Sequence, residues 1–216
     1  MSFFSNFQSD RSPGPITGNP MNGLCEKVCL QVKKVFDACL KQGQEDNVII
    51  QLTDNVPASP VYPLTFVSAK STSTSATLTN VTIDRLPDRP SFARVQASVG
   101  IPVEVVYTDA NGTEGVGNGV ATFSEDVVLF VPEPSVIPYS LDAVVSLVAP
   151  EGTYVPDNTF SVTACTTIIL KIVMDAEILV PSYGYTTIPP CNEYSQEVCS
   201  GFFELPLYPG NNNNNT

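Results

Sequence analysis

The feature that most constrains the fold is a strict alternation of apolar and other residues between Val95 and Tyr107. Its apolar positions are Val95, Ala97, Val99, Ile101, Val103, Val105 and Tyr107, and Val106 is the one exception. A second run of the same period extends from Phe160 to Val180 and is broken only at Thr166. Successive side chains on a strand point to opposite faces, so this period predicts strands with one dry face. An all-β domain is therefore the first inference.

Further strands are predicted over residues 48–52, 61–69, 76–83, 92–108, 119–131 and 139–149. The strands at 92–108 and 119–131 should form a hairpin, because Asn111-Gly112 lies between them. Proline and glycine punctuate the series, which favours an antiparallel β-sandwich or an open barrel. The segment 160–180 exceeds the usual strand length of about 5–10 residues, so we expect it to bend, bulge or cross between sheets. The expected core comprises Val95, Val99, Ile101, Val103, Val105, Leu170, Ile172 and Ile178.

Residues 24–40 show a different period and predict one N-terminal amphipathic helix, within a segment 23–42. The apolar stripe at about 100° per residue contains Leu24, Val28, Val32, Val35, Phe36 and Cys39. Asn22 is a suitable N-cap and Gly43 a suitable stop. The β domain is then expected over residues 43–182.

Both termini are predicted to be extended arms. Residues 1–22 are rich in Ser, Asn, Gly and Pro and should form a flexible arm, with Phe3, Phe4 and Phe7 at its tip. Two alternatives are open for these phenylalanines: they belong to an irregular terminus without a function, or they form an apolar arm that binds a neighbouring subunit. Residues 183–216 are rich in aromatic residues and proline, contain two cysteines, and should lie extended on a surface.

The charge balance excludes several partners. The chain has 22 acidic and 10 basic residues, for a net charge of −12. Binding of nucleic acid or of an anionic membrane needs clusters of Lys and Arg, so neither is expected. A self-repelling acidic surface is the simpler interpretation, and divalent-cation binding is the alternative. No secretion signal and no run of 18 apolar residues is visible, so we expect the protein to remain in, or be assembled from, the cell that makes it.

The residue types also restrict the chemistry. Histidine is absent, which removes Ser-His-Asp and Cys-His catalysis, and no phosphate-binding or dinucleotide motif occurs. Pairs of carboxylates remain open as a hydrolase site. Asp109, Asn111 and Glu114 are oxygen ligands suited to calcium, although a solvated hairpin loop is the preferred interpretation. Glu125 and Asp126 are expected to cap a turn. No cofactor is expected.

Six cysteines are the remaining candidate functional residues: Cys25, Cys29, Cys39, Cys165, Cys191 and Cys199. They cluster in the predicted helix and the tail rather than in the β core. Three alternatives are open: buried reduced thiols, disulfides within or between subunits, and metal ligands. Zinc is the weakest, because no C-x₂-C pair and no histidine are present.

Two blocks carry a resemblance to a known family. The segment from Cys25 to Cys39, CEKVCLQVKKVFDAC, resembles the N-terminal helix of uncharacterised proteins from spore-forming clostridia. The stretches GIPVEVVY (100–107), FSEDVVLF (123–130), VPSYGY (180–185) and IPPC (188–191) are similar to the SPOCS domain of clostridial spore proteins. This resemblance covers about residues 76–180 and implies a β-rich, self-assembling building block of the spore coat or exosporium, with no catalytic residues.

We therefore expect a non-enzymatic structural protein of the spore surface, made in the mother-cell cytoplasm. It should form a homo-oligomer or polymer, in contact with other spore-surface proteins. The terminal arms, and possible disulfides, would supply the subunit contacts. The alternative is an extracellular carbohydrate- or protein-binding β-sandwich module, with Tyr183, Tyr185, Tyr194 and Tyr208 as its exposed aromatic residues.

Overall fold

The computed structural model describes residue 16 and residues 18–186, and this part of the chain is mainly β. Its strands are β1 (Glu26–Gln51), β2 (Asp54–Val56), β3 (Thr65–Ser71), β4 (Thr77–Leu86), β5 (Arg89–Thr108), β6 (Glu114–Phe130), β7 (Ser140–Val155) and β8 (Thr159–Ser182). Among the described residues, no helix is long and apolar enough to cross a membrane.

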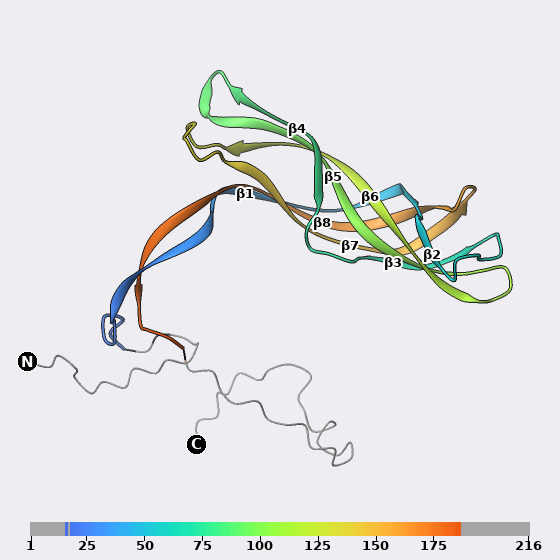
Figure 1. The fold of residues 1–216 in the computed structure, drawn as a ribbon. Coiled ribbons are helices and arrows are strands. Elements are labelled where there is room, and N and C mark those ends of the chain that lie inside the picture. The colour runs from blue at the N-terminus through green and yellow to red at the C-terminus, as the bar shows by residue number, and fades with distance from the viewer. Residues whose placement is uncertain (1–15, 17, 187–216) are drawn as a thin grey trace, which may run out of the picture. The chain divides into compact units, whose positions relative to one another are not determined.

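The eight strands form one antiparallel sheet in the order β1-β8-β7-β3-β5-β6-β2, with β4 also paired to β5. The predicted hairpin is confirmed: β5 and β6 pair from Phe92 opposite Phe130 to Thr108 opposite Glu114. These two strands run side by side over most of their length (Figure 1). On the other side of β5, β4 pairs with its first half and β3 with its last residues.

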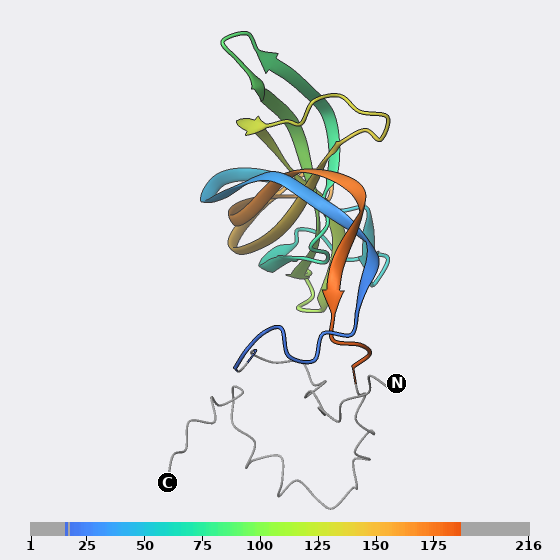
Figure 2. The same ribbon diagram turned by 90° about the vertical axis from the view of Figure 1, so that its left-hand side faces the viewer.

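The sheet curls so that strands from opposite ends of this order come into contact (Figure 2). Just beyond β1, the Thr53 N–H donates to the Asn118 carbonyl of β6 at 2.8 Å. A Cβ atom at Gly119 would lie 2.7 Å from Ile50 Cγ2 and 2.8 Å from the Gln51 carbonyl oxygen, so only glycine fits this approach. The fold is thus a single curled sheet, and neither a sandwich of two sheets nor a barrel is confirmed.

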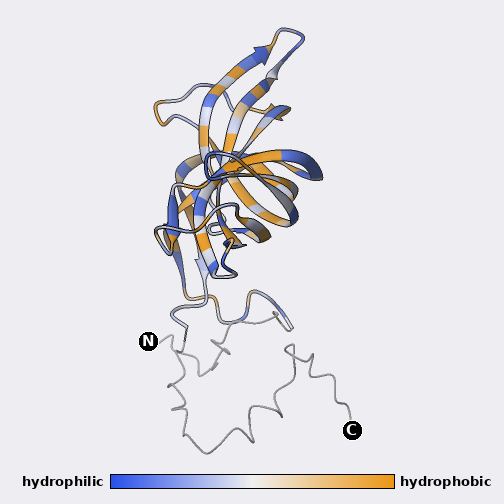
Figure 3. Cartoon of the chain, turned by 90° about the vertical axis from the view of Figure 1, so that its right-hand side faces the viewer, coloured by the Kyte–Doolittle hydropathy of each residue, from blue (hydrophilic) through white to orange (hydrophobic). Residues whose placement is uncertain are grey.

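The core lies on the concave face and follows the predicted alternation. Apolar and polar bands alternate along the strands (Figure 3). Seven of the eight predicted core positions are buried: Val95, Val99, Ile101, Val103, Val105, Leu170 and Ile172. The eighth prediction, Ile178, is wrong, because this residue is 38% exposed. The β7–β8 ladder ends at Ser140 opposite Val173, so Ile178 lies beyond the part of β8 that β7 covers.

The predicted N-terminal helix is wrong, because residues 26–51 form the continuous strand β1. Helix propensity is a weak prior that tertiary pairing overrides. The apolar stripe contains Val28, Val32, Val35 and Phe36, which are β-branched or aromatic and suit a strand as well as a helix. β8 runs unbroken for 24 residues and stays in one sheet, so the expected crossing to another sheet is wrong. The expected bend is present, because β8 curves strongly along its length (Figure 1). β8 is the neighbour of β1 in the sheet. Backbone hydrogen bonds join the two segments just outside both ends of β1, from the Cys25 N–H to the Ser182 carbonyl and from the Leu52 N–H to the Asn158 carbonyl.

The chain divides into two compact units, Met1–Val28 with Val180–Thr216, and Cys29–Leu179. Every buried core residue in the described part of the chain belongs to the second unit. In the first, the Cys25 N–H donates to the Ser182 carbonyl at 2.9 Å, and the Tyr183 hydroxyl donates to the Pro20 carbonyl. Most of the predicted N-terminal arm, and the tail from residue 187, lie outside the described residues.

Candidate functional site

Four of the six cysteines fall within the described residues, and all four thiols are free. Cys25 directly precedes β1, Cys29 and Cys39 lie on β1, and Cys165 lies on β8. Cys25, Cys29 and Cys165 are exposed, whereas Cys39 is partly buried. The other predicted contact residues lie outside the described part of the chain: Cys191, Cys199, Phe3, Phe4 and Phe7.

Cys39 differs from the other thiols in its surroundings. Burial raises the pKa of the Cys39 thiol, and the negative charges of Asp37 and Glu125 raise it further, against a lowering hydrogen bond with the Leu170 backbone. The thiolate is the reactive form of cysteine, so a raised pKa makes Cys39 less reactive at neutral pH. The exposed strand thiols Cys29 and Cys165 are therefore the better candidates for cross-links.

The loop between β5 and β6 contains the residues considered for calcium. The Asp109 carboxylate accepts hydrogen bonds from the backbone N–H groups of Asn111 at 2.9 Å, Thr113 at 2.8 Å and Val61 at 3.2 Å. These bonds, led by the one from Thr113, hold the pKa of Asp109 below its usual value. Asp109 thus stabilises the turn between β5 and β6 through these hydrogen bonds. Among the described residues, no three His, Cys, Asp or Glu side chains gather closely enough to hold a metal ion.

Glu125 and Asp126 do not cap a turn, because both lie in the body of β6 and point to opposite faces. The Glu125 side chain is 2% exposed and points inward. There it accepts hydrogen bonds from the Lys41 ammonium group of β1, at 2.8 Å to Oε1 and 3.0 Å to Oε2. Nearby, the Phe130 N–H at the end of β6 donates to the Asp37 carboxylate at 2.7 Å. Two side chains of β1 thus bind β6, which lies near the other end of the strand order.

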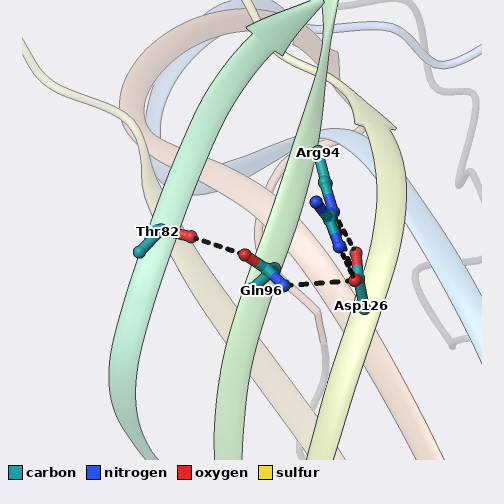
Figure 4. A network of polar contacts seen from close by, with 4 residues as sticks. All are labelled: Thr82, Arg94, Gln96 and Asp126. Carbon is teal, nitrogen blue, oxygen red and sulfur yellow. Dashed lines mark hydrogen bonds and ion pairs between the residues drawn. The ribbon is translucent and has the colours of Figure 1, made fainter.

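A polar network occupies the outer face of β4, β5 and β6 (Figure 4). Arg94 Nε donates to Asp126 Oδ1 at 2.8 Å, the Gln96 amide donates to Asp126 Oδ2 at 3.1 Å, and the Thr82 hydroxyl lies 3.5 Å from Gln96 Oε1. The Arg94 hydrogen bonds lower the pKa of Asp126. Thr82, Gln96 and Asp126 border a groove of about 430 Å³ that is also lined by Asn80.

Sequence reasoning missed this network and the Lys41–Glu125 pair. The outer network had a detectable signal, because Arg94, Gln96 and Asp126 all have outward parity on the predicted hairpin. The Lys41–Glu125 pair had no detectable signal in the sequence, since Lys41 was expected on a helix. The network's groups satisfy one another, which suits a structural role of holding the outer surface of three strands in register.

Comparison with protein-family models, with curated proteins and with solved structures found no match. The functional conclusion therefore rests on the residues and contacts of this chain.

Proposed function

We propose that this chain is a non-enzymatic structural protein that self-assembles on the spore surface. The observation that carries the proposal is the exposure of the free thiols of Cys25, Cys29 and Cys165. Structural cysteines that only pack in a core are buried and inert, whereas these three reach solvent. Exposed thiols on strands are placed to form disulfides with a neighbouring copy once the surroundings become oxidising.

The assignment to the spore surface rests on the SPOCS-like blocks described above. In this proposal the protein is made in the mother-cell cytoplasm, where thiols stay reduced, and is cross-linked late at the spore exterior. The tail thiols Cys191 and Cys199 are the expected partners of the strand thiols on a neighbouring copy. Phe3, Phe4 and Phe7 add an apolar contact, because burial of one aromatic side chain stabilises by roughly 1.5–3 kcal/mol.

A second candidate is a carbohydrate- or protein-binding module, and two observations favour it. Tyr185, which follows β8, is 88% exposed and offers a free aromatic face. The groove lined by Asn80, Thr82, Gln96 and Asp126 offers amide, hydroxyl and carboxylate groups. Thr82, Gln96 and Asp126 already bond to one another, and the Asn80 amide donates to the Ser98 hydroxyl, so we rank this candidate second.

The test uses the purified full chain under oxidising and reducing conditions. We expect filaments or sheets in negative-stain microscopy, and a ladder on non-reducing gels that collapses to monomer with reductant. A Cys29→Ser, Cys165→Ser double variant should lose much of the ladder, as should Cys191→Ser, Cys199→Ser. Cys39→Ser is the matched control and should keep it. Monodisperse monomers under every condition would contradict self-assembly and favour the binding module.

A further inference from the structure

One part of the sheet has only two strands. β8 pairs with β7 up to Val173 opposite Ser140, and then continues to Ser182. Beyond Val173, β1 is the only strand beside β8 in the described part of the chain. β1 and β8 run side by side beyond Val173 in both views (Figure 1, Figure 2). We call residues 29–35 of β1 and 174–179 of β8 the ribbon, and all of them lie in the unit Cys29–Leu179.

The ribbon exposes an unusual amount of apolar side chain for so short a segment. Leu30 is 43% exposed, Val35 49%, Ile178 38% and Leu179 71%. A two-stranded ribbon is at best marginally stable in water, and three or more strands are needed for independent stability. Among the described residues no further strand pairs with either outer edge, and a free strand edge is a template for another strand. The ribbon is therefore suited to strand addition.

The charges on the two ribbon strands select the occupant. Lys33 and Lys34 lie on β1, and Asp175 and Glu177 lie on β8. Joining two β1 edges would bring lysines together, and joining two β8 edges would bring carboxylates together, both of which destabilise a sheet. Joining the β1 edge of one copy to the β8 edge of another puts one of the two lysines on the same face as the carboxylates of Asp175 and Glu177, because Lys33 and Lys34 point to opposite faces whereas Asp175 and Glu177 share one. The carboxylates of Asp175 and Glu177 form no ion pair within the described residues.

We propose that the β1 edge of the ribbon binds the β8 edge of the ribbon in a second copy of this chain. This inference rests on the proposed self-assembly and identifies the contact that drives it. β1 and β8 are antiparallel within one copy, so adding the next copy in the same orientation continues an antiparallel sheet. Leu30 of one copy and Leu179 of the next then come within reach of a cross-strand contact. The two joined edges differ, so each new copy leaves a free edge and the assembly propagates.

The test reverses the charges on one edge at a time. The variant Lys33→Glu, Lys34→Glu has two acidic edges, and Asp175→Lys, Glu177→Lys has two basic edges. Each alone should associate about tenfold or more weakly than wild type, because like charges replace opposite ones. An equimolar mixture should recover assembly, since every acidic edge then has a basic partner. Light scattering gives the extent of assembly and negative-stain microscopy its form, under the oxidising conditions in which wild type assembles.

A matched control for the lysine reversal is Lys70→Glu, Arg89→Glu. It makes the same charge change and removes similar exposed contacts. Lys70 lies 3.5 Å from Glu104, as Lys33 lies 3.7 Å from Asp142, and Arg89 lies over the Phe92 ring as Lys34 lies over that of Phe36. This control should assemble like wild type. Circular dichroism and urea unfolding of each variant confirm that the fold is kept.

The outcomes separate this inference from the proposed function. If wild type stays monomeric, the proposed self-assembly fails, and the ribbon contact fails with it. If wild type and both charge variants assemble equally, only the ribbon contact is wrong. If the single variants fail and their mixture also fails, the charges act by another route and the ribbon contact is again overturned. Recovery in the mixture alone supports the proposed pairing of unlike edges.

Discussion

The ion pair between Lys41 and Glu125 offers the sharpest test of how β1 is held to the rest of the sheet. The perturbation is Lys41→Met, which keeps an unbranched side chain, one heavy atom shorter, and removes the charge. The Glu125 carboxylate would then be left without its cationic partner, although its side chain is only 2% exposed. Asp37 and its hydrogen bond from the Phe130 N–H would be unchanged.

The expected cost follows from the unequal burial of the two partners. Breaking a fully buried ion pair by removing one side costs about 3–5 kcal/mol, and breaking an exposed pair costs about 0–1 kcal/mol. Glu125 belongs to the first class, whereas Lys41 is 57% exposed, so water can replace part of its contribution. We therefore expect Lys41→Met to lower the free energy of unfolding by about 2 kcal/mol.

The assay is urea unfolding in reducing buffer at pH 7, followed by tyrosine fluorescence, because the chain has no tryptophan. The matched control is Lys70→Met, whose partner Glu104 lies 3.5 Å away with its side chain 33% exposed; it should cost about 0–0.5 kcal/mol. The double variant Lys41→Met, Glu125→Leu should return close to wild type, because no buried charge remains. Equal losses for Lys41→Met and Lys70→Met would refute the reasoning.

Two further predictions concern the core and the hairpin turn. Ile172 is fully buried, so Ile172→Ala should lower the free energy of unfolding by about 2–5 kcal/mol. Ile178 is 38% exposed, so Ile178→Ala should lower it by less than about 1 kcal/mol. Similar losses for the two variants in urea unfolding would contradict their placement. The lowered pKa of Asp109 stabilises the fold above the unfolded-state pKa, and this contribution is lost as pH falls through the folded-state pKa. The stability difference between wild type and Asp109→Asn should therefore shrink from about pH 5 toward pH 3, and a constant difference would contradict the role of its charge.

The β character and the central hairpin could be predicted because their signals are local. Alternation from Val95 to Tyr107 identifies the buried face, and Asn111-Gly112 identifies the turn, where Gly112 has a φ of 80°. The pairing of the flanking strands then follows from the alternation. That all eight strands join one curled sheet could not be predicted. The curl depends on contacts between residues distant in sequence, such as that of Gly119 with the end of β1.

The error in β1 has a physical cause. The stripe from Leu24 to Cys39 satisfies a helical period, yet most of β1 is exposed as a strand, so neither face gives a clean alternation. Its pairing with β8 supplies backbone hydrogen bonds that no local pattern reports. The exposure of Cys165 could be predicted, because in the alternation from Phe160 to Val180 it has the parity of the polar positions, and the structure shows it exposed. The partners of Asp37 and Lys41 on β6 could not be predicted from a helical β1.

Neither a helix nor a strand over this segment would let Cys29 and Cys39 form a disulfide with each other. On a helix, Cys29 and Cys39 would lie about 15 Å apart along the axis. On a strand with a rise of about 3.3 Å per residue, the separation is about 33 Å. A disulfide needs Cα atoms within about 7 Å, so these two thiols cannot pair with each other within β1. Any disulfide that Cys29 forms must join β1 to a cysteine on another segment or another copy, and its exposure beside the open edge of the ribbon favours another copy.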